Sequence, residues 1–149
     1  MKFLKRSFYF LLILLFSAWL YCNSLIGVEE QVKTYYSELK NELIKKNYPT
    51  NIFVISGRRW KWDNYLLQKY GGAASKSKHK SGQAIDIIVL DINGDGKSDA
   101  DDVDIVYKIL DKKIVQSNGG IGTYKKESGF FNRQMIHFDC RGNKARWNR

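Results

Sequence analysis

The chain has 149 residues, 44% of them apolar and 14% aromatic, and its formal net charge is +10. This composition excludes an intrinsically disordered chain, and the length suits one globular domain with its own hydrophobic core. A strongly basic balance favours anionic partners, which include nucleic acids, anionic lipids and acidic polymers of the cell envelope.

Residues 1–27 have the character of a targeting segment. Three basic residues precede an apolar run that begins at Phe8 and continues to Trp19, which is the layout of a charged n-region and an h-region. Tyr21 is not the small residue expected before a cleavage site, and the run is slightly shorter than the about 20 residues of a spanning helix. The segment is therefore a signal peptide or a membrane anchor, and its basic start predicts that the remainder is exported, to the periplasm or the cell wall.

Export narrows the choice of anionic partner. The first 27 residues supply three positive charges and no acidic residue, so the exported part keeps a net charge of +7. Seven acidic residues lie between Asp86 and Asp104, so basic residues dominate elsewhere, notably in the C-terminal sequence RGNKARWNR. We expect an anionic cell-envelope surface as partner and no nucleic acid, although a solvated basic face without a partner fits the charge equally well.

Hydrophobic periodicity predicts three helices in this part of the chain. The first spans residues 28–46, is stopped by Pro49, and has apolar residues at helical spacing: Val32, Tyr35, Tyr36, Leu39, Leu43 and Ile44. A short helix at residues 62–72 is closed by two glycines. A third, at residues 101–114, places Val103, Val106, Tyr107 and Leu110 on one face.

Four short runs rich in β-branched and aromatic residues predict strands: NIFVIS, AIDIIVL, GGIGTY and QMIHFD. The fold class is therefore α+β, with a small antiparallel sheet and flanking helices. Residues 51–149 form the expected domain, and residues 28–50 are a helix and connection that join it to the N-terminal hydrophobic segment.

The two cysteines do not suggest a disulfide framework. Cys22 lies beside the apolar N-terminal run and Cys140 lies near the C-terminus. We expect Cys140 to be a small buried residue.

Both histidines of the chain lie near aspartates. His79 is in a loop of lysines and serines, seven residues ahead of Asp86 in an expected strand, and His137 alternates with Asp139 in another. Imidazole nitrogens and carboxylate oxygens are good zinc ligands, and the first pair can converge if the chain turns back at Gly82. A single histidine is more often structural, but the two pairs together indicate a metal site.

Three blocks of this sequence resemble the family of zinc peptidases that includes D-alanyl-D-alanine carboxypeptidases and murein endopeptidases. SKHKSGQAIDI is similar to the family signature S-x-H-x-x-G-x-A-x-D, and GGIGTY with MIHFDCRGNKARW resembles the ending of its exported branch. ISGRRW resembles the family's S-G-[YF]-R segment, and the blocks run in family order from about Phe53 to Trp147. The resemblance implies a hedgehog/DD-peptidase-like fold and hydrolysis of peptide bonds in peptidoglycan stem peptides.

Carried over position by position, the resemblance also implies the site residues. The zinc ligands would be His79, Asp86 and His137. Arg59 would pair with a substrate carboxylate or a developing oxyanion through its guanidinium group. Two further residues would support the loop or contact the peptide, Ser77 and Gln83.

The catalytic base is the point at which the sequence departs from much of the family. Many members have an acidic residue three positions before the last zinc ligand, where this chain has Gln134, which cannot accept a proton. The exported branch has an aspartate two residues after that ligand, so Asp139 is the expected base and Glu127 a more distant candidate. Asp139 fits equally well as a partner that orients His137.

The segment DINGDGKSDADD, residues 91–102, resembles the twelve-residue calcium loop of an EF-hand or a dockerin. Oxygen ligands lie at the required spacing, a glycine occupies position six, and a helix is expected to follow. Aspartate replaces the usual glutamate at position twelve; an acidic solvated turn is the alternative interpretation. The expected calcium ligands are Asp91, Asn93, Asp95, Lys97 through its carbonyl, Asp99 and Asp102.

Together these features predict an exported or membrane-tethered zinc peptidase with a structural calcium ion, acting as a D,D-carboxypeptidase or an endopeptidase. The alternative is a non-catalytic envelope-binding module that keeps the peptidase fold, which Gln134 would permit. A nucleic-acid-binding protein would account for the charge but not for export.

Overall fold

A computed structural model describes residues 2–22, 24–59, 65, 69, 76–126 and 133–149 of the chain. Its helices are α1 (Lys2–Cys22), α2 (Glu30–Lys45) and α4 (Ala100–Ile109), with a 3-10 helix η1 (Lys78–Ser81) and a π-helical segment η2 (Leu110–Ile114). Its strands are β1 (Ile52–Ser56), β2 (Ala84–Val89), β3 (Gly120–Lys126), β4 (Arg133–Asp139) and β5 (Ala145–Asn148). The helix predicted at residues 62–72 lies outside the described residues, apart from two isolated positions.

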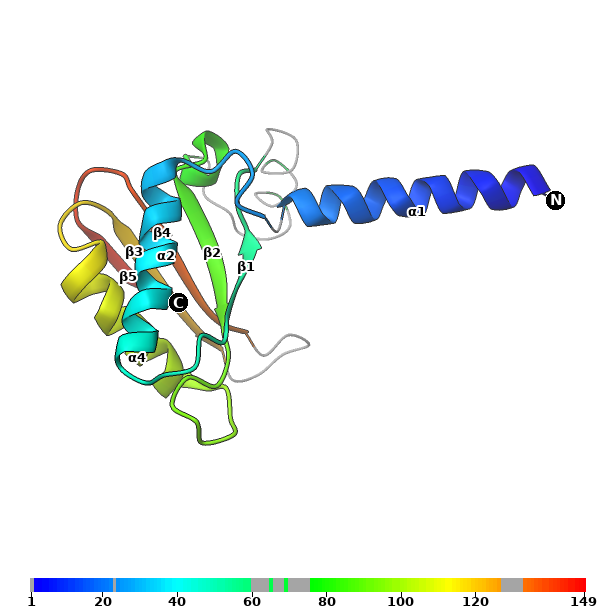
Figure 1. The fold of residues 1–149 in the computed structure, drawn as a ribbon. Helices are drawn as coiled ribbons and strands as arrows, with labels where there is room; N and C mark the ends of the chain where they lie inside the picture. The colour runs from blue at the N-terminus through cyan, green and yellow to red at the C-terminus, as the bar shows by residue number, and fades with distance from the viewer. Residues whose placement is uncertain (1, 23, 60–64, 66–68, 70–75, 127–132) are drawn as a thin grey trace.

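The five strands form one sheet in the order β1-β2-β4-β3-β5 (Figure 1). Neighbouring strands are antiparallel except β3 and β5, which are parallel. The α+β class is therefore confirmed, but the prediction of an antiparallel sheet is wrong, because the sheet is mixed. The difference comes from β5: after β4 the chain turns at Gly142, where φ is 82°, and returns along the outer edge of β3.

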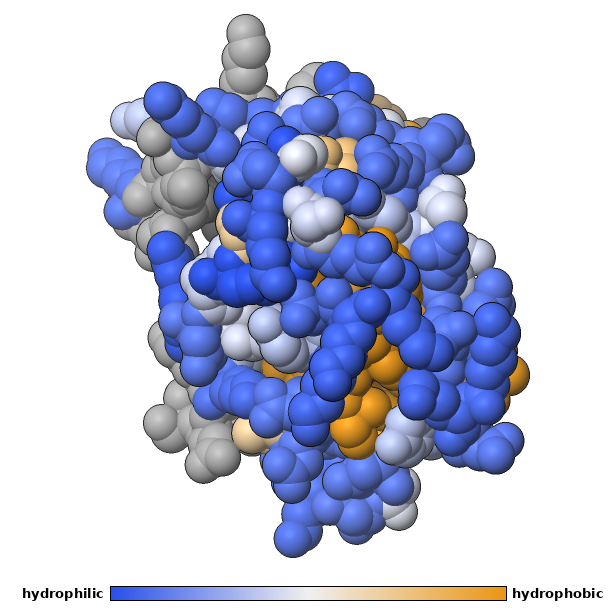
Figure 2. Space-filling model, turned by 90° about the vertical axis from the view of Figure 1, so that its left-hand side faces the viewer, coloured by the Kyte–Doolittle hydropathy of each residue, from blue (hydrophilic) through white to orange (hydrophobic). Residues whose placement is uncertain are grey.

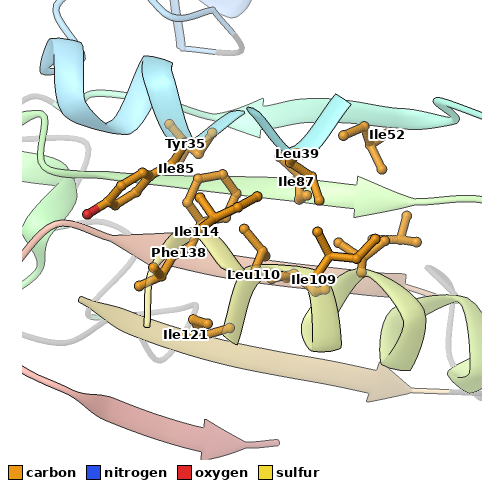
Figure 3. Packing of buried hydrophobic residues seen from close by; sticks show 14 of the residues in the cluster. Tyr35, Leu39, Ile52, Ile85, Ile87, Ile109, Leu110, Ile114, Ile121 and Phe138 are labelled. Carbon is orange, nitrogen blue, oxygen red and sulfur yellow. The ribbon is translucent and has the colours of Figure 1, made fainter. Parts of the chain in front are cut away.

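Helices α2 and α4 cover one face of the sheet, and the hydrophobic core lies between them and the strands (Figures 1 and 3). The apolar stripe predicted for α2 is confirmed except at Ile44, which is 60% exposed. Because α2 contributes to this core, residues 28–50 belong to the domain rather than only connecting it. The strands contribute Ile52, Ile85, Ile87, Val89, Ile121, Ile136 and Phe138.

Helix α1 extends away from the domain (Figure 1). Its apolar side chains from Phe8 to Phe16 are exposed, with Phe10 at 64%. Of the helices that the structure describes, none combines the length and the apolar character that crossing a membrane would need.

Cys140 is buried directly after β4, as predicted. Its Sγ atom lies 3.5 Å from Glu29 Oε2, and burial, followed by the neighbouring Glu29 carboxylate, raises the pKa of the thiol to about 11. We therefore expect Cys140 in the folded protein to react with iodoacetamide at pH 7.5 on the order of a hundredfold more slowly than a free thiol. Peptide mapping by mass spectrometry, with and without denaturant, measures this; equal rates in both conditions would contradict it.

Candidate metal centre

The face of the sheet away from α2 and α4 carries a row of residues aligned by the strand register. Ser56 of β1 pairs with Asp86 of β2, and Asp86 pairs with His137 of β4. His137 also pairs with Gly122 of β3, which lies beside Trp147 of β5. Directly paired residues point to the same face of a sheet, so all five strands contribute to one row with Asp86 and His137 at its centre.

His79 reaches this row from the 3-10 helix η1. The chain turns back into β2 at Gly82, where φ is 76°, a left-handed conformation that favours glycine. A Cβ atom there would lie 2.3 Å from the carbonyl oxygen of Gly27, so a larger residue would have to displace the backbone. The turn places the His79 ring against Asp86, as the spacing predicted, and leaves it 2% exposed.

The donor atoms of His79, Asp86 and His137 form a small triangle. His79 Nε2 is 3.2 Å from Asp86 Oδ1 and 3.1 Å from His137 Nδ1, and the edge from His137 Nδ1 to Asp86 Oδ1 is 2.7 Å. Tetrahedral ligands at about 2.0–2.1 Å from zinc are about 3.3 Å apart, so the two edges from His79 already nearly fit, and the edge from His137 to Asp86 must widen by about 0.6 Å. Within the described part of the chain, these three residues form the only group of His, Cys, Asp and Glu side chains whose donor atoms are close enough together to hold a metal ion.

Both histidines are oriented by contacts on the side away from the triangle. His79 Nδ1 donates a hydrogen bond to the carbonyl oxygen of Gly57 at 2.8 Å, which leaves Nε2 of the neutral ring unprotonated. His137 Nε2 lies 3.2 Å from Asp139 Oδ2, which leaves Nδ1 for the triangle. These outer contacts determine which nitrogen each ring presents to a metal ion.

Arg59 holds the Asp86 carboxylate in place. Its Nη2 donates to Asp86 Oδ2 at 2.6 Å and its Nε donates to Ser56 Oγ at 2.9 Å, so Asp86 Oδ1 is left facing the histidines. The backbone N–H of Arg59 also donates to the carbonyl oxygen of His79 at 2.9 Å. The structure therefore brings Arg59 to the site as predicted; its pairing with a substrate stays a prediction.

Ser77 and Gln83 lie at the two ends of η1. The carbonyl oxygen of Ser77 accepts a hydrogen bond from the N–H of Lys80, and Gln83 Oε1 accepts one from Ser81 Oγ at 3.1 Å. Both residues thus support the loop that carries His79, which is one of the two roles expected for them.

Asp139 is fully buried behind His137. It accepts hydrogen bonds from Gly120 N–H at 2.9 Å and from Arg141 Nε and Nη2 at 2.8 and 2.5 Å, in addition to its contact with His137. Burial alone would raise its pKa, but the hydrogen bonds from His137 and Arg141 outweigh burial and lower the pKa. A carboxylate engaged in this way, on the far side of His137 from the triangle, is placed to orient the ring rather than to accept a proton from a metal-bound water.

Gln134 lies on the opposite face of β4 from His137, because the two residues are three positions apart and side chains alternate between the two faces of a strand. It is 2% exposed, and neither atom of its side-chain amide has a hydrogen-bond partner. An acidic residue at this position of β4 would also point away from the triangle. The presence of glutamine here therefore does not show whether the protein has a catalytic base. Glu127, the more distant candidate, lies outside the described residues.

Protons and a metal ion compete for the triangle. Burial lowers the pKa of His137, but hydrogen bonds to Asp139 and Asp86 outweigh burial and raise the pKa. At mildly acidic pH, His137 Nδ1 is therefore protonated and donates a hydrogen bond to Asp86. A metal ion must displace this proton, and we expect zinc affinity to fall about tenfold per pH unit below the raised pKa of His137. Chelator competition between pH 5 and 8 measures the slope; affinity independent of pH would contradict it.

The predicted calcium loop connects β2 to α4. The Asp91 carboxylate accepts hydrogen bonds from the N–H groups of Gly94 at 2.6 Å and Gly96 at 2.9 Å, and Asp95 Oδ1 accepts one from Lys97 N–H at 2.8 Å. Both glycines have positive φ angles, 82° and 84°, which a tight turn of this kind requires. Backbone N–H groups of the loop thus donate hydrogen bonds to the carboxylates of both Asp91 and Asp95.

Asp102 has a different role from the one predicted at position twelve. It is fully buried, its Oδ1 accepts hydrogen bonds from Ile92 and Asn93 N–H, and its Oδ2 accepts one from Asp99 N–H. Asp99 in turn accepts a bond from Asp101 N–H, so Asp99 and Asp102 cap the first turn of α4. The acidic residues of this described loop do not come together as His79, Asp86 and His137 do, and calcium binding stays a prediction.

Two residues near the triangle, Arg141 and Trp147, were not predicted as site residues. The Trp147 indole lies over Gly122, where a Cβ atom would be 2.2 Å from the ring, and its centroid is 5.3 Å from that of His137. The Arg141 guanidinium lies 5.2 Å from the Trp147 ring. Both residues fall in a block that resembles the peptidase family. Their place beside His137 could not be predicted, because the sequence did not indicate β5, the strand that carries Trp147.

A scan against protein-family models and searches of curated proteins and of solved structures found no match. The resemblance to zinc peptidases therefore rests on the sequence blocks, and the metal centre rests on its own geometry.

Proposed function

We propose that this chain is a zinc-dependent peptidase that hydrolyses peptide bonds in peptidoglycan stem peptides, as a D,D-carboxypeptidase or an endopeptidase. The observation that carries the proposal is the buried triangle of His79, Asp86 and His137. Two imidazole nitrogens and one carboxylate oxygen are a donor set that suits a catalytic zinc ion with a fourth position for water. The sequence blocks that contain these residues supply the substrate class.

A zinc ion bound here would lower the pKa of a bound water molecule and polarise the scissile carbonyl group. The residues of the chain then have three tasks. His79, Asp86 and His137 hold the ion, and Asp139 keeps the His137 ring turned toward it. Arg59 places a positive charge beside Asp86 and would pair with a substrate carboxylate or with the oxyanion that develops during hydrolysis.

A second candidate function is a non-catalytic envelope-binding module that keeps the metal centre. The specific observation in its favour is the position of Asp139, whose oxygens already accept hydrogen bonds from Gly120, Arg141 and His137. Among the described residues, Asp139 was the expected base, and these contacts favour an orienting role for it. A protein without a base can bind the peptide but cannot activate the water efficiently.

Zinc analysis of the purified full-length protein, combined with mass spectrometry of muropeptides after incubation, separates these candidates. A peptidase is expected to hold zinc and to release D-alanine or shortened peptides. Zinc without any change in the muropeptides, together with their binding, would favour the module. A protein that neither retains added zinc nor alters muropeptides would contradict both.

We further propose that the domain acts outside the cytoplasm against an anionic envelope surface, with residues 1–27 as signal peptide or membrane tether. The exposed apolar side chains of α1 support a targeting or lipid-associated segment. The net charge of +7 on residues 28–149 supports an anionic partner. Figure 2 shows a face of the molecule that is largely hydrophilic, with an apolar strip near its middle.

Calcium is the second ion that we propose, bound in the loop of residues 91–102. The spacing of Asp91, Asn93 and Asp95 and the two left-handed glycines support this assignment. Asp102 would have to release backbone N–H groups to reach the ion, so the weaker end of the EF-hand affinity range is expected. The loop leaves β2 five residues after Asp86, so an ion there would hold the end of the strand that carries a zinc ligand.

A further inference from the structure

We propose that Arg141 and Trp147 are positioning residues of the metal centre. Together with Asp139 they form a closed ring of contacts that fixes the His137 imidazole for metal binding. The inference rests on metal binding at the proposed site and does not depend on peptidase activity.

The ring can be followed contact by contact. Asp139 Oδ2 lies 3.2 Å from His137 Nε2 and 2.5 Å from Arg141 Nη2, so one carboxylate oxygen joins the two side chains. The Arg141 guanidinium lies 5.2 Å from the Trp147 ring, a distance typical of a cation–π contact. Trp147 then completes the ring of contacts, because the centroid of its indole is 5.3 Å from the centroid of the His137 imidazole.

Two glycines of β3 make room for this arrangement. Gly122 pairs with both His137 and Trp147, and a Cβ atom on it would lie 2.2 Å from the indole, so only glycine lets the indole lie beside the histidine. Gly120 donates its N–H to Asp139 Oδ1, and a Cβ atom there would lie 2.6 Å from Oδ2 of the same carboxylate.

This ring of contacts fixes the orientation of the His137 imidazole. Asp139 is fully buried, so its charge must be balanced within the protein, and Arg141 supplies that balance through two nitrogens. Trp147 packs beside His137, which is 8% exposed, so little water can compete for the contact between His137 and Asp139. His137 is thus held with Nδ1 toward the triangle before any metal ion arrives, which lowers the cost of ordering the site on binding.

Cobalt and zinc dissociation constants of full-length variants, measured by competition with a chromophoric chelator, test the inference. Arg141→Gln, Asp139→Asn and Trp147→Leu are each expected to weaken metal binding about 10- to 100-fold. Trp147→Phe keeps an aromatic ring over Gly122 and is expected to retain most of the affinity. Arg141→Lys keeps the charge but loses the planar fork, so it should behave like Arg141→Gln.

Arg146→Gln is the matched control for Arg141→Gln. Arg146 also forms a half-buried ion pair, from Nε to Asp111 Oδ1 at 2.7 Å, and it precedes Trp147 in β5, so its side chain points to the opposite face. Arg146→Gln should lower the melting temperature, because the ion pair is lost. It should change the metal affinity by no more than about twofold, because mutations at distant sites act independently.

Three results would overturn the inference: wild-type affinity in Arg141→Gln, a loss of affinity in Arg146→Gln equal to that in Arg141→Gln, or no metal binding by the wild type. A wild-type protein that binds cobalt but hydrolyses no muropeptide would contradict the proposed peptidase alone and leave the positioning roles to be decided by the dissociation constants.

Discussion

Asp86→Ala is expected to leave the protein without bound zinc and therefore without hydrolytic activity. Asp86 Oδ1 lies 3.2 and 2.7 Å from the facing nitrogens of His79 and His137, so its removal takes one corner from a three-ligand site. It also leaves Arg59, whose side chain is 14% exposed, without its carboxylate, and breaking such a buried pair costs about 3–5 kcal/mol. Zinc content after gel filtration and the melting temperature measure the two effects.

Asp86→Asn separates metal loss from unfolding, because it keeps the shape of the side chain and loses its charge. His79→Ala and His137→Ala are expected to abolish zinc retention in the same way. Asp111→Asn is the control, since Asp111 pairs with Arg146 on the helix side of the sheet and should leave zinc content unchanged. Full zinc occupancy in any of the ligand variants would remove that residue from the ligand set.

The fold was predictable where a periodic pattern spans a whole element. The four predicted strands and the helices at residues 28–46 and 101–114 are confirmed within a few residues, because burial on one face or both leaves an alternating or helical pattern. β5 gave no such pattern: it has four residues, all partly or largely exposed, and it pairs only with β3 at the sheet edge. Because β5 was not predicted, the sheet was predicted to be antiparallel, whereas it is mixed.

The residues of the candidate metal centre could be predicted from the sequence, but the contacts around them could not. The chain has only two histidines, so each could be considered with the aspartate near it, and the family resemblance then implied His79, Asp86 and His137 as the ligand set. The orientation of Asp139 depends on Arg141 and Gly120, and the position of Trp147 depends on Gly122, and these contacts follow from the register of β3, β4 and β5. Sequence spacing alone carries no information on that register, so the choice between base and orienting residue stayed open.

Calcium is expected to raise the melting temperature of the protein, and this effect tests the loop of residues 91–102. An ion that binds only the folded chain adds RT ln(1 + [L]/Kd), which is about 2.7 kcal/mol at a hundredfold excess over Kd. For a chain of this size, that free energy corresponds to a shift of roughly 5–15 °C. Magnesium should give a smaller shift, because it keeps its water molecules and demands a tighter octahedral geometry. Thermal unfolding followed by circular dichroism, with and without millimolar calcium, measures the shift.

Asp91→Ala combined with Asp95→Ala is expected to abolish the calcium shift. Asp101→Ala is the matched control, because Asp101 is an exposed acidic residue of the same segment that occupies none of the predicted ligand positions. The double variant should also weaken zinc retention, since the loop is tied to β2 by Ser98 Oγ, which donates to the carbonyl oxygen of Val89 at 2.9 Å, and β2 carries Asp86. A wild-type melting curve that calcium does not move would contradict the calcium loop, and unchanged zinc retention in the double variant would contradict its coupling to the metal centre.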